Sequence, residues 1–240
     1  SIRRQRQMCM RDSRTGGQIL IDQLILHKIN VIFMVPGESF LPAIDALYDK
    51  KNNIKVIVCR HEASACNMAE AFSKITGKPS ICFVTRGPGA CHASVGIHTA
   101  QQDSTPMILL IGQVPTYLKN KEAFQEVDYI KFFSKPFAKL VMEVNKGSDI
   151  PQAFSKIYAK SISGRPGPVV LSLPENTLVN KYNVKKFLPY LFFGLILWFF
   201  THESGVHATI SGVLLATVIP HRDKKKDFSL LTKIEHNISP

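Results

Sequence analysis

The chain has 240 residues, of which 45% are hydrophobic, enough for one large domain or for one domain and an appendage. Its formal net charge is +12, but no basic stripe with interleaved aromatic residues runs through the body of the chain, so no nucleic-acid partner is expected. The five cysteines form no Cys-x-x-Cys motif, which argues against a disulfide framework or a structural zinc site and favours a reducing cytoplasm.

The first segment, residues 1–14, is basic, with five arginines against one aspartate. It lacks the apolar core of a secretory signal, although its composition is compatible with a mitochondrial transit peptide. We interpret it as a disordered lead-in, with the natural start near Met8 or Met10.

The next segment, residues 15–180, alternates between two kinds of pattern. Apolar residues recur at helical spacing in several stretches, as at Ile21, Leu24 and Ile25. Continuous apolar runs, typical of buried strands, separate these stretches. The predicted strands are 31–35, 54–59, 80–85, 106–111, 139–144 and 168–173. Alternating strands and helices predict one α/β domain with a doubly wound parallel sheet.

The last segment, residues 181–240, has a different character. Residues 187–200 carry no charge, and residues 206–220 are again apolar. Each run is shorter than the roughly 20 residues of an ordinary membrane-spanning helix. A hairpin of two short helices would still place the flanking Lys and Arg clusters on one side of a membrane. The alternative is a pair of buried helices, but residues 187–200 lack the polar face that a helix in water needs.

Four loops follow predicted strands of the α/β domain, at residues 36–39, 61–62, 86–89 and 112–114. The carboxyl ends of parallel strands meet at one edge of a sheet, where such folds bind ligands. Each loop alone is more typical of a structural turn. Together they predict one shared crevice, in which glycines let the backbone approach a flat ligand.

Glu62 is the candidate reactive group in these loops. It ends a strand and opens a helix rich in small residues, Ala63, Ala65, Cys66 and Ala69. This position suits a carboxyl that serves a cofactor. It also suits a carboxyl that only caps the helix.

Several motifs occur in the order and spacing of a known family. They are Val35-Pro36-Gly37-Glu38-Ser39-Phe40-Leu41, Arg60-His61-Glu62-Ala63, Met68-Ala69-Glu70-Ala71-Phe72, Thr76-Gly77-Lys78-Pro79, Thr85-Arg86-Gly87-Pro88-Gly89-Ala90, Gln102-Asp103-Ser104-Thr105-Pro106, Gly112-Gln113-Val114, Glu122-Ala123-Phe124-Gln125-Glu126 and Ser163-Gly164-Arg165-Pro166-Gly167-Pro168. Through these motifs, residues 15–178 resemble the N-terminal, pyrimidine-binding domain of thiamine-diphosphate enzymes of the acetolactate synthase type.

The resemblance implies an enzyme that decarboxylates and joins 2-keto acids with thiamine diphosphate. It makes Glu62 and Gln113 the catalytic residues, with Glu62 bonded to N1′ of the aminopyrimidine and Gln113 on the substrate side. Phe124 and Gln125 would lie near the substrate. The residues implied to contact the cofactor are Pro36, Gly37, Glu38, Glu62, Gly87, Pro88, Gly89 and His92.

The chain departs from the family in two places. Cys91-His92 stands where relatives usually carry Thr-Asn, and no Gly-Asp-Gly motif occurs, so magnesium and the diphosphate would be bound by a domain that is missing here. No metal ligand is therefore assigned in this chain, and a flavin has no support in the sequence. The resemblance implies a homodimer, or a partner chain that supplies the diphosphate-binding domain, and no activity of this chain alone.

The last segment resembles an internal piece of bacterial sodium/proton antiporters of the A type. The resemblance rests on residues 190–220, which include Glu203-Ser204-Gly205-Val206-His207-Ala208-Thr209, and on Ile234-Glu235-His236. It implies that Glu235 and His236 belong to a pH-sensing loop, but the paired aspartates that carry ions are missing. The sequence thus favours a cytoplasmic enzyme domain joined to an antiporter-like fragment. The alternatives are a noncatalytic module anchored to a membrane through residues 187–220, and a fragment of a sodium/proton antiporter with a regulatory domain.

Overall fold

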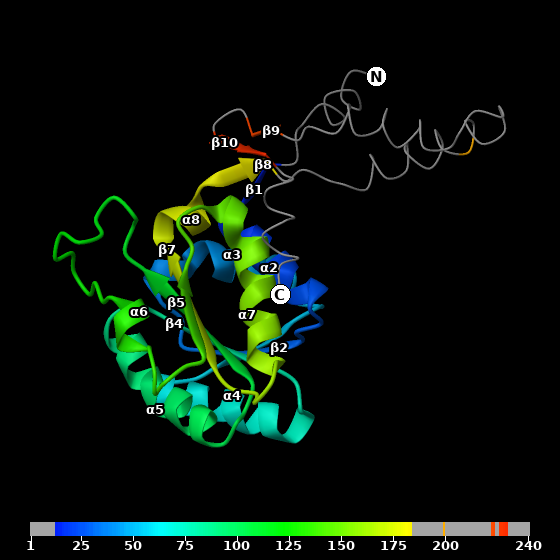
Figure 1. Ribbon diagram of the computed structural model, residues 1–240, viewed down its shortest axis with the longest axis vertical. Coiled ribbons are helices and arrows are strands. Elements are labelled where there is room, and N and C mark those ends of the chain that lie inside the picture. The colour runs from blue at the N-terminus through cyan, green and yellow to red at the C-terminus, as the bar shows by residue number, and fades with distance from the viewer. Residues whose placement is uncertain (1–12, 184–198, 200–221, 224–225, 230–240) are drawn as a thin grey trace. The chain divides into compact units, whose positions relative to one another are not determined.

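The computed structural model describes residues 13–183, 199, 222–223 and 226–229 (Figure 1). The chain divides into two units, Ser1–Val184 and Lys185–Pro240. In the second unit, β9 (Arg222–Asp223) pairs antiparallel with β10 (Lys226–Ser229). Except for Phe199, the hairpin predicted over residues 187–220 lies outside the described residues, as do Glu235 and His236. Among the helices that are described, none is both long and apolar enough to cross a membrane.

The first unit contains a six-stranded sheet in which all neighbouring strands are parallel. The strand order is β3-β2-β4-β5-β7-β6. All six predicted strands are confirmed, with every end within two residues of its predicted position. The strands are β2 (Val31–Met34), β3 (Lys55–Val58), β4 (Ser80–Val84), β5 (Met107–Gln113), β6 (Leu140–Glu143) and β7 (Val169–Pro174).

Helices cover both faces of this sheet, which confirms the doubly wound α/β domain. The long helices are α2 (Gly16–Leu26), α3 (Leu41–Asp49), α4 (Glu62–Thr76), α5 (Pro88–Gln102) and α7 (Ile150–Ile162). Figure 1 shows α2, α3 and α7 on one face and α4 and α5 on the other. The short helices are η1 (Glu38–Phe40), α6 (Tyr129–Phe132), η2 (Gly147–Asp149) and α8 (Glu175–Val179).

Successive residues of the central strand β5 enter opposite cores. Ile108 and Leu110 pack with α2, α3 and α7, whereas Leu109 and Ile111 pack with α4 and α5. Both faces are therefore buried, and this is why the strand appears in the sequence as a continuous apolar run.

A feature that the sequence did not predict joins the two ends of the domain. The short strand β1 (Ser13–Thr15) pairs antiparallel with β8 (Lys181–Asn183), outside the main sheet. Arg14 also forms an ion pair with Asp22 of α2. Neither of these three-residue strands has an apolar pattern in the sequence, although the Tyr182 ring packs against the core.

The strand order reverses direction between β2 and β4. From β2 the chain moves outward to β3 and then returns to the other side of β2 to form β4. The loops that follow β2 and β4 therefore leave the sheet on either side of this reversal, where open α/β sheets bind ligands.

Candidate functional site

The loops after β2 and β4 contact each other at this reversal. The hydroxyls of Ser39 and Thr85 share a hydrogen bond of 2.8 Å. Gly37 packs directly against Thr85, and Pro36 leads from β2 into this turn. The structure thus brings together the loops after β2 and β4, and Gly112, of the loop at the end of β5, also packs against Ser39.

Arg86 extends this contact to a third loop. Its guanidinium lies 2.7 Å from the carboxylate of Glu38 and 3.4 Å from that of Glu175, the first residue of α8 after β7. The Arg86 side chain is only 11% exposed, whereas that of Glu38 is 67% exposed. The largely buried Arg86 side chain therefore connects the segments after β2 and β7, and Glu38 lies on its solvent side.

Glu62 lies at the start of α4, with its side chain 14% exposed. Its Oε2 is 3.1 Å from Nδ1 of His92, on α5. Its other oxygen, Oε1, faces Gly89, where an added Cβ would lie 3.5 Å away. Glu62 and His92 therefore form one unit across the starts of two helices, and Gly89 leaves the second oxygen open.

The residue that caps α4 is His61, the neighbour of Glu62, and not Glu62 itself. His61 is the N-cap residue of α4, and its Nδ1 accepts a hydrogen bond of 3.2 Å from the Ala63 N–H. The His61 ring also stacks on His92, with ring centroids 4.8 Å apart. Because His61 caps the helix, the Glu62 carboxylate is available for another interaction.

Gly87 fixes the turn before α5. Its φ is +63°, a conformation that favours glycine, and an added Cβ would lie 2.7 Å from the Cβ of Gln125. Its N–H donates to the hydroxyl of Tyr129 at 2.8 Å. Burial raises the pKa of Tyr129 to about 12. Pro88 and Gly89 are the first two residues of α5.

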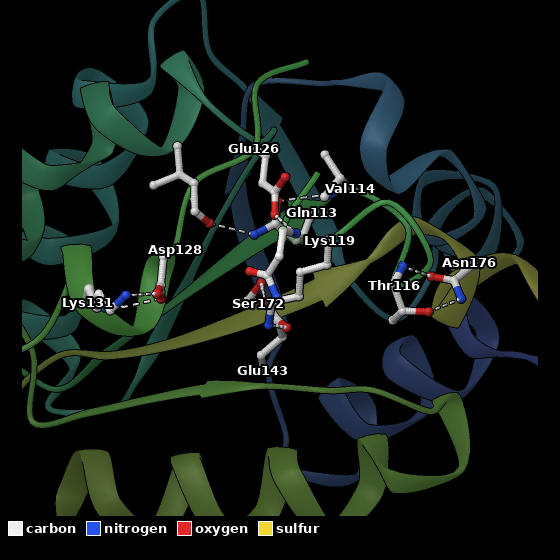
Figure 2. Close-up of polar contacts among 12 residues, drawn as sticks. Gln113, Val114, Thr116, Lys119, Glu126, Asp128, Lys131, Glu143, Ser172 and Asn176 are labelled. Carbon is white, nitrogen blue, oxygen red and sulfur yellow. Dashed lines mark hydrogen bonds and ion pairs between the residues drawn. The ribbon is translucent and has the colours of Figure 1, made fainter. Parts of the chain in front are cut away.

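Gln113 is buried at the end of β5 and faces the loop that follows. Its Nε2 donates to the carbonyl of Val127 at 2.7 Å, and its Oε1 accepts from the Val114 N–H at 2.9 Å (Figure 2). Of the two residues expected near substrate, Gln125 packs against Gly87, and Phe124 is 79% exposed. Both the nitrogen and the oxygen of the Gln113 side-chain amide are thus used in contacts with the loop.

Other polar contacts hold the same loop, residues 114–128 (Figure 2). Thr116 and Asn176 exchange two hydrogen bonds of 2.9 Å, and Lys119 forms an ion pair with the buried Glu143. Glu126 accepts the N–H groups of Asn120 and Ala123, and these bonds, that of Asn120 first, lower its pKa. The loop is therefore held both by its own hydrogen bonds, through Glu126, and by contacts to α8 and β6.

Sequence reasoning missed several of these residues. Thr85, Arg86 and His61 lie inside the motifs quoted above, but the sequence analysis assigned them no role. Their partners are Ser39 for Thr85, Glu38 for Arg86, and Ala63 and His92 for His61. Tyr129 and Lys119 gave no signal, because their partners are 42 and 24 residues away along the chain.

Two family models match the chain. The model described as "Thiamine pyrophosphate enzyme, N-terminal TPP binding domain" matches residues 14–132. The model "Na+/H+ antiporter 1" matches residues 166–240. The second match begins inside the α/β domain, because residues 166–183 include β7, α8 and β8.

Curated acetolactate synthases match a longer part of the chain than either family model does. The "Probable acetolactate synthase large subunit" of Methanocaldococcus jannaschii is 37% identical over 172 residues, which are 72% of this chain and 29% of that protein. The "Acetolactate synthase large subunit" of Buchnera aphidicola from Acyrthosiphon pisum is 42% identical over 173 residues, 71% of this chain and 30% of that protein. The "Acetolactate synthase isozyme 3 large subunit" of Escherichia coli K12 is 38% identical over 177 residues, 74% and 30% respectively. The chain thus spans less than a third of the length of these relatives.

Proposed function

We propose that the N-terminal part of this chain forms the pyrimidine-binding half of an active site. This part is an acetolactate-synthase-like thiamine-diphosphate domain, and an antiporter-like segment follows it. The observation that carries this proposal is Glu62. It is a largely buried carboxylate beside the reversal of strand order, its helix is capped by another residue, and one of its oxygens faces a glycine.

The residues at this edge fit an aminopyrimidine. A side chain at Gly89 would lie 2.9 Å from Cγ2 of Thr85 and 3.5 Å from Oε1 of Glu62, so only glycine leaves this oxygen approachable. A flat ring with nitrogen donors and acceptors suits such an opening. Pro36, Gly37, Glu38, Gly87 and Pro88 would line the approach to it.

Glu62 would share a proton with the ring nitrogen N1′ of the bound cofactor in a charge-assisted hydrogen bond, and His92 would orient the carboxyl through the 3.1 Å contact between its Nδ1 and Oε2. Thiamine diphosphate, when bound, supplies the electron sink for decarboxylation and joining of 2-keto acids. Gln113 acts on the substrate side by holding the 114–128 loop, which carries Phe124 and Gln125.

The other half of the site comes from a diphosphate-binding domain outside these 240 residues in this proposal. The chain has no Gly-Asp-Gly motif, so Mg²⁺ and the diphosphate would be bound by a second domain, in a homodimer or in a partner chain. The α/β domain would work in the cytoplasm, and its acetolactate synthase activity would require that partner.

Binding of the pyrimidine moiety alone tests this proposal, because it does not require the diphosphate-binding half of the site. We expect the purified chain to bind thiamine and 4-amino-5-hydroxymethyl-2-methylpyrimidine, as measured by saturation-transfer NMR. Glu62→Gln should weaken binding about tenfold or more, because a hydrogen bond to a charged group contributes about 1.5–3 kcal/mol. Asp45→Asn, an exposed carboxylate on α3, is the matched control. Unchanged binding by a folded Glu62→Gln variant would refute the assignment.

A second, smaller proposal concerns the tail. The likeness of residues 166–240 to an antiporter family supports membrane contact through the two apolar runs, residues 187–200 and 206–220. Co-sedimentation of the full chain with phospholipid vesicles tests it, with a chain ending at residue 183 as the control. Equal recovery of both chains in the supernatant would reject membrane contact.

A further inference from the structure

We propose that His61, Glu62 and His92 form a binding site for a divalent transition-metal ion such as Zn²⁺, Co²⁺ or Ni²⁺. The site joins the start of α4 to the first turns of α5. It goes beyond the proposed function, since it requires neither thiamine nor a second polypeptide.

The spacing of the ligand atoms supports this site. One ligand atom from each of the three residues lies within 4.8 Å of the other two. Bonds of about 2.0–2.2 Å place two ligands of a tetrahedral ion roughly 3.3 Å apart. The 3.1 Å between Glu62 Oε2 and His92 Nδ1 already approaches that separation.

His61 needs only a local change to become the third ligand. Its exposed ring stacks on His92 with centroids 4.8 Å apart, so it lies beside the other two residues. A turn of the ring directs a nitrogen toward the ion and releases the hydrogen bond from the Ala63 N–H. Metal ligation requires a nitrogen lone pair on His92, so a proton on its Nδ1 would leave when the metal takes its place.

The donor chemistry selects the class of ion. Two imidazoles and one carboxylate suit zinc and its neighbours, whereas Mg²⁺ and Ca²⁺ prefer oxygen ligands alone. The negative charge of Glu62 offsets the positive ends of the two helices. Three protein ligands also leave a fourth position for water. This site therefore differs in ligand type from the magnesium site that a diphosphate requires.

Metal titration of the full chain, without a histidine tag, tests the site. Co²⁺ binding is followed by visible absorption, and Zn²⁺ by competition. We expect one ion bound through this cluster and a loss of affinity of about tenfold or more in His61→Asn and in His92→Asn, as for loss of groups that hold a metal. The histidines at 202, 207, 221 and 236 give the same background in every variant.

His98→Asn is the matched control, because His98 is an exposed histidine on the same helix that packs against Phe137. It should bind Co²⁺ like the unmodified chain. Equal affinity of His61→Asn, His92→Asn and His98→Asn would overturn the proposal, as would the absence of Co²⁺ binding by the unmodified chain.

A footprint on the unmodified chain gives an answer even if a variant fails to fold. Diethyl pyrocarbonate modifies accessible imidazoles, and mass spectrometry locates the modified histidines. We expect Zn²⁺ to protect His61 and His92 and to leave His98 unprotected. Equal modification of His61 and His92 with and without Zn²⁺ would refute the site, whatever the outcome of the thiamine experiment.

Discussion

The hydroxyl of Tyr129 accepts the backbone N–H of Gly87 at 2.8 Å, which ties the start of α6 to the turn that opens α5. Tyr129 is completely buried, with 1% of its surface exposed. The contact thus joins the end of the 114–128 loop to the glycine turn beside Glu62, and both depend on the same phenol.

Replacement of this phenol should change how stability depends on pH. The folded chain keeps the Tyr129 proton up to a pKa of about 12, whereas the unfolded chain loses it near 10.0. The contribution of the Tyr129 hydroxyl to the free energy of unfolding is therefore complete below pH 10. It decreases by up to about 2.7 kcal/mol as the pH rises from 10 to 12. Tyr129→Phe should remove this part of the decrease in the free energy of unfolding at alkaline pH, as measured by urea unfolding at pH 8 and pH 11. Tyr48→Phe, at an exposed tyrosine, should leave it unchanged.

Gly87→Ala should destabilise the domain by about 1–3 kcal/mol, because its backbone is in a region that only glycine adopts easily. The new Cβ would also press against Gln125. Gly164→Ala is the control, since Gly164 also has a positive φ, +55°, but has no atom within 4 Å of an added Cβ. Urea unfolding should show the larger loss at position 87. An equal or larger loss at position 164 would contradict the role of the Gln125 contact.

Lys119→Met should destabilise the domain by about 1–3 kcal/mol, because it leaves the buried carboxylate of Glu143 without its cation. Ser172 would still donate to Glu143 at 3.1 Å. In a double-mutant cycle with Glu143→Gln, the double variant should lose less than the sum of the single losses. Lys121→Met, at an exposed lysine of the same loop, should lie within about 0.5 kcal/mol of the unmodified chain. Additive losses would show that the pair is not coupled.

His92→Ala should weaken binding of the pyrimidine moiety about two- to tenfold, because a single hydrogen bond that orients Glu62 contributes about 0.5–1.5 kcal/mol. The loss should be smaller than that of Glu62→Gln. Saturation-transfer NMR measures both, with His98→Ala as the control. Tighter binding by His92→Ala would mean that His92 competes with the ligand.

The alternation of apolar runs and helical periodicity was sufficient to predict the sheet and its covering helices. Strands such as 80–84 are buried on both faces, and their composition carries that information locally. The meeting of the loops after β2 and β4 also followed from the rule that parallel strands end at one edge.

The remaining contacts join residues that have no common local pattern. Tyr129 meets Gly87, and Lys119 meets Glu143, only after the 114–128 loop has folded back on the domain. The orientation of Gln113 depends on the same loop. These contacts depend on tertiary packing, which periodicity does not describe.

The β1–β8 ribbon has a consequence for how this domain combines with other sequences. Residues 13–15 and 181–183 run side by side, so the chain enters and leaves the domain at nearly the same point. A domain with neighbouring ends tolerates insertion and fusion well. The α/β domain can therefore be exchanged between proteins as one cassette, and an unrelated segment can follow residue 183 without entering the six-stranded sheet.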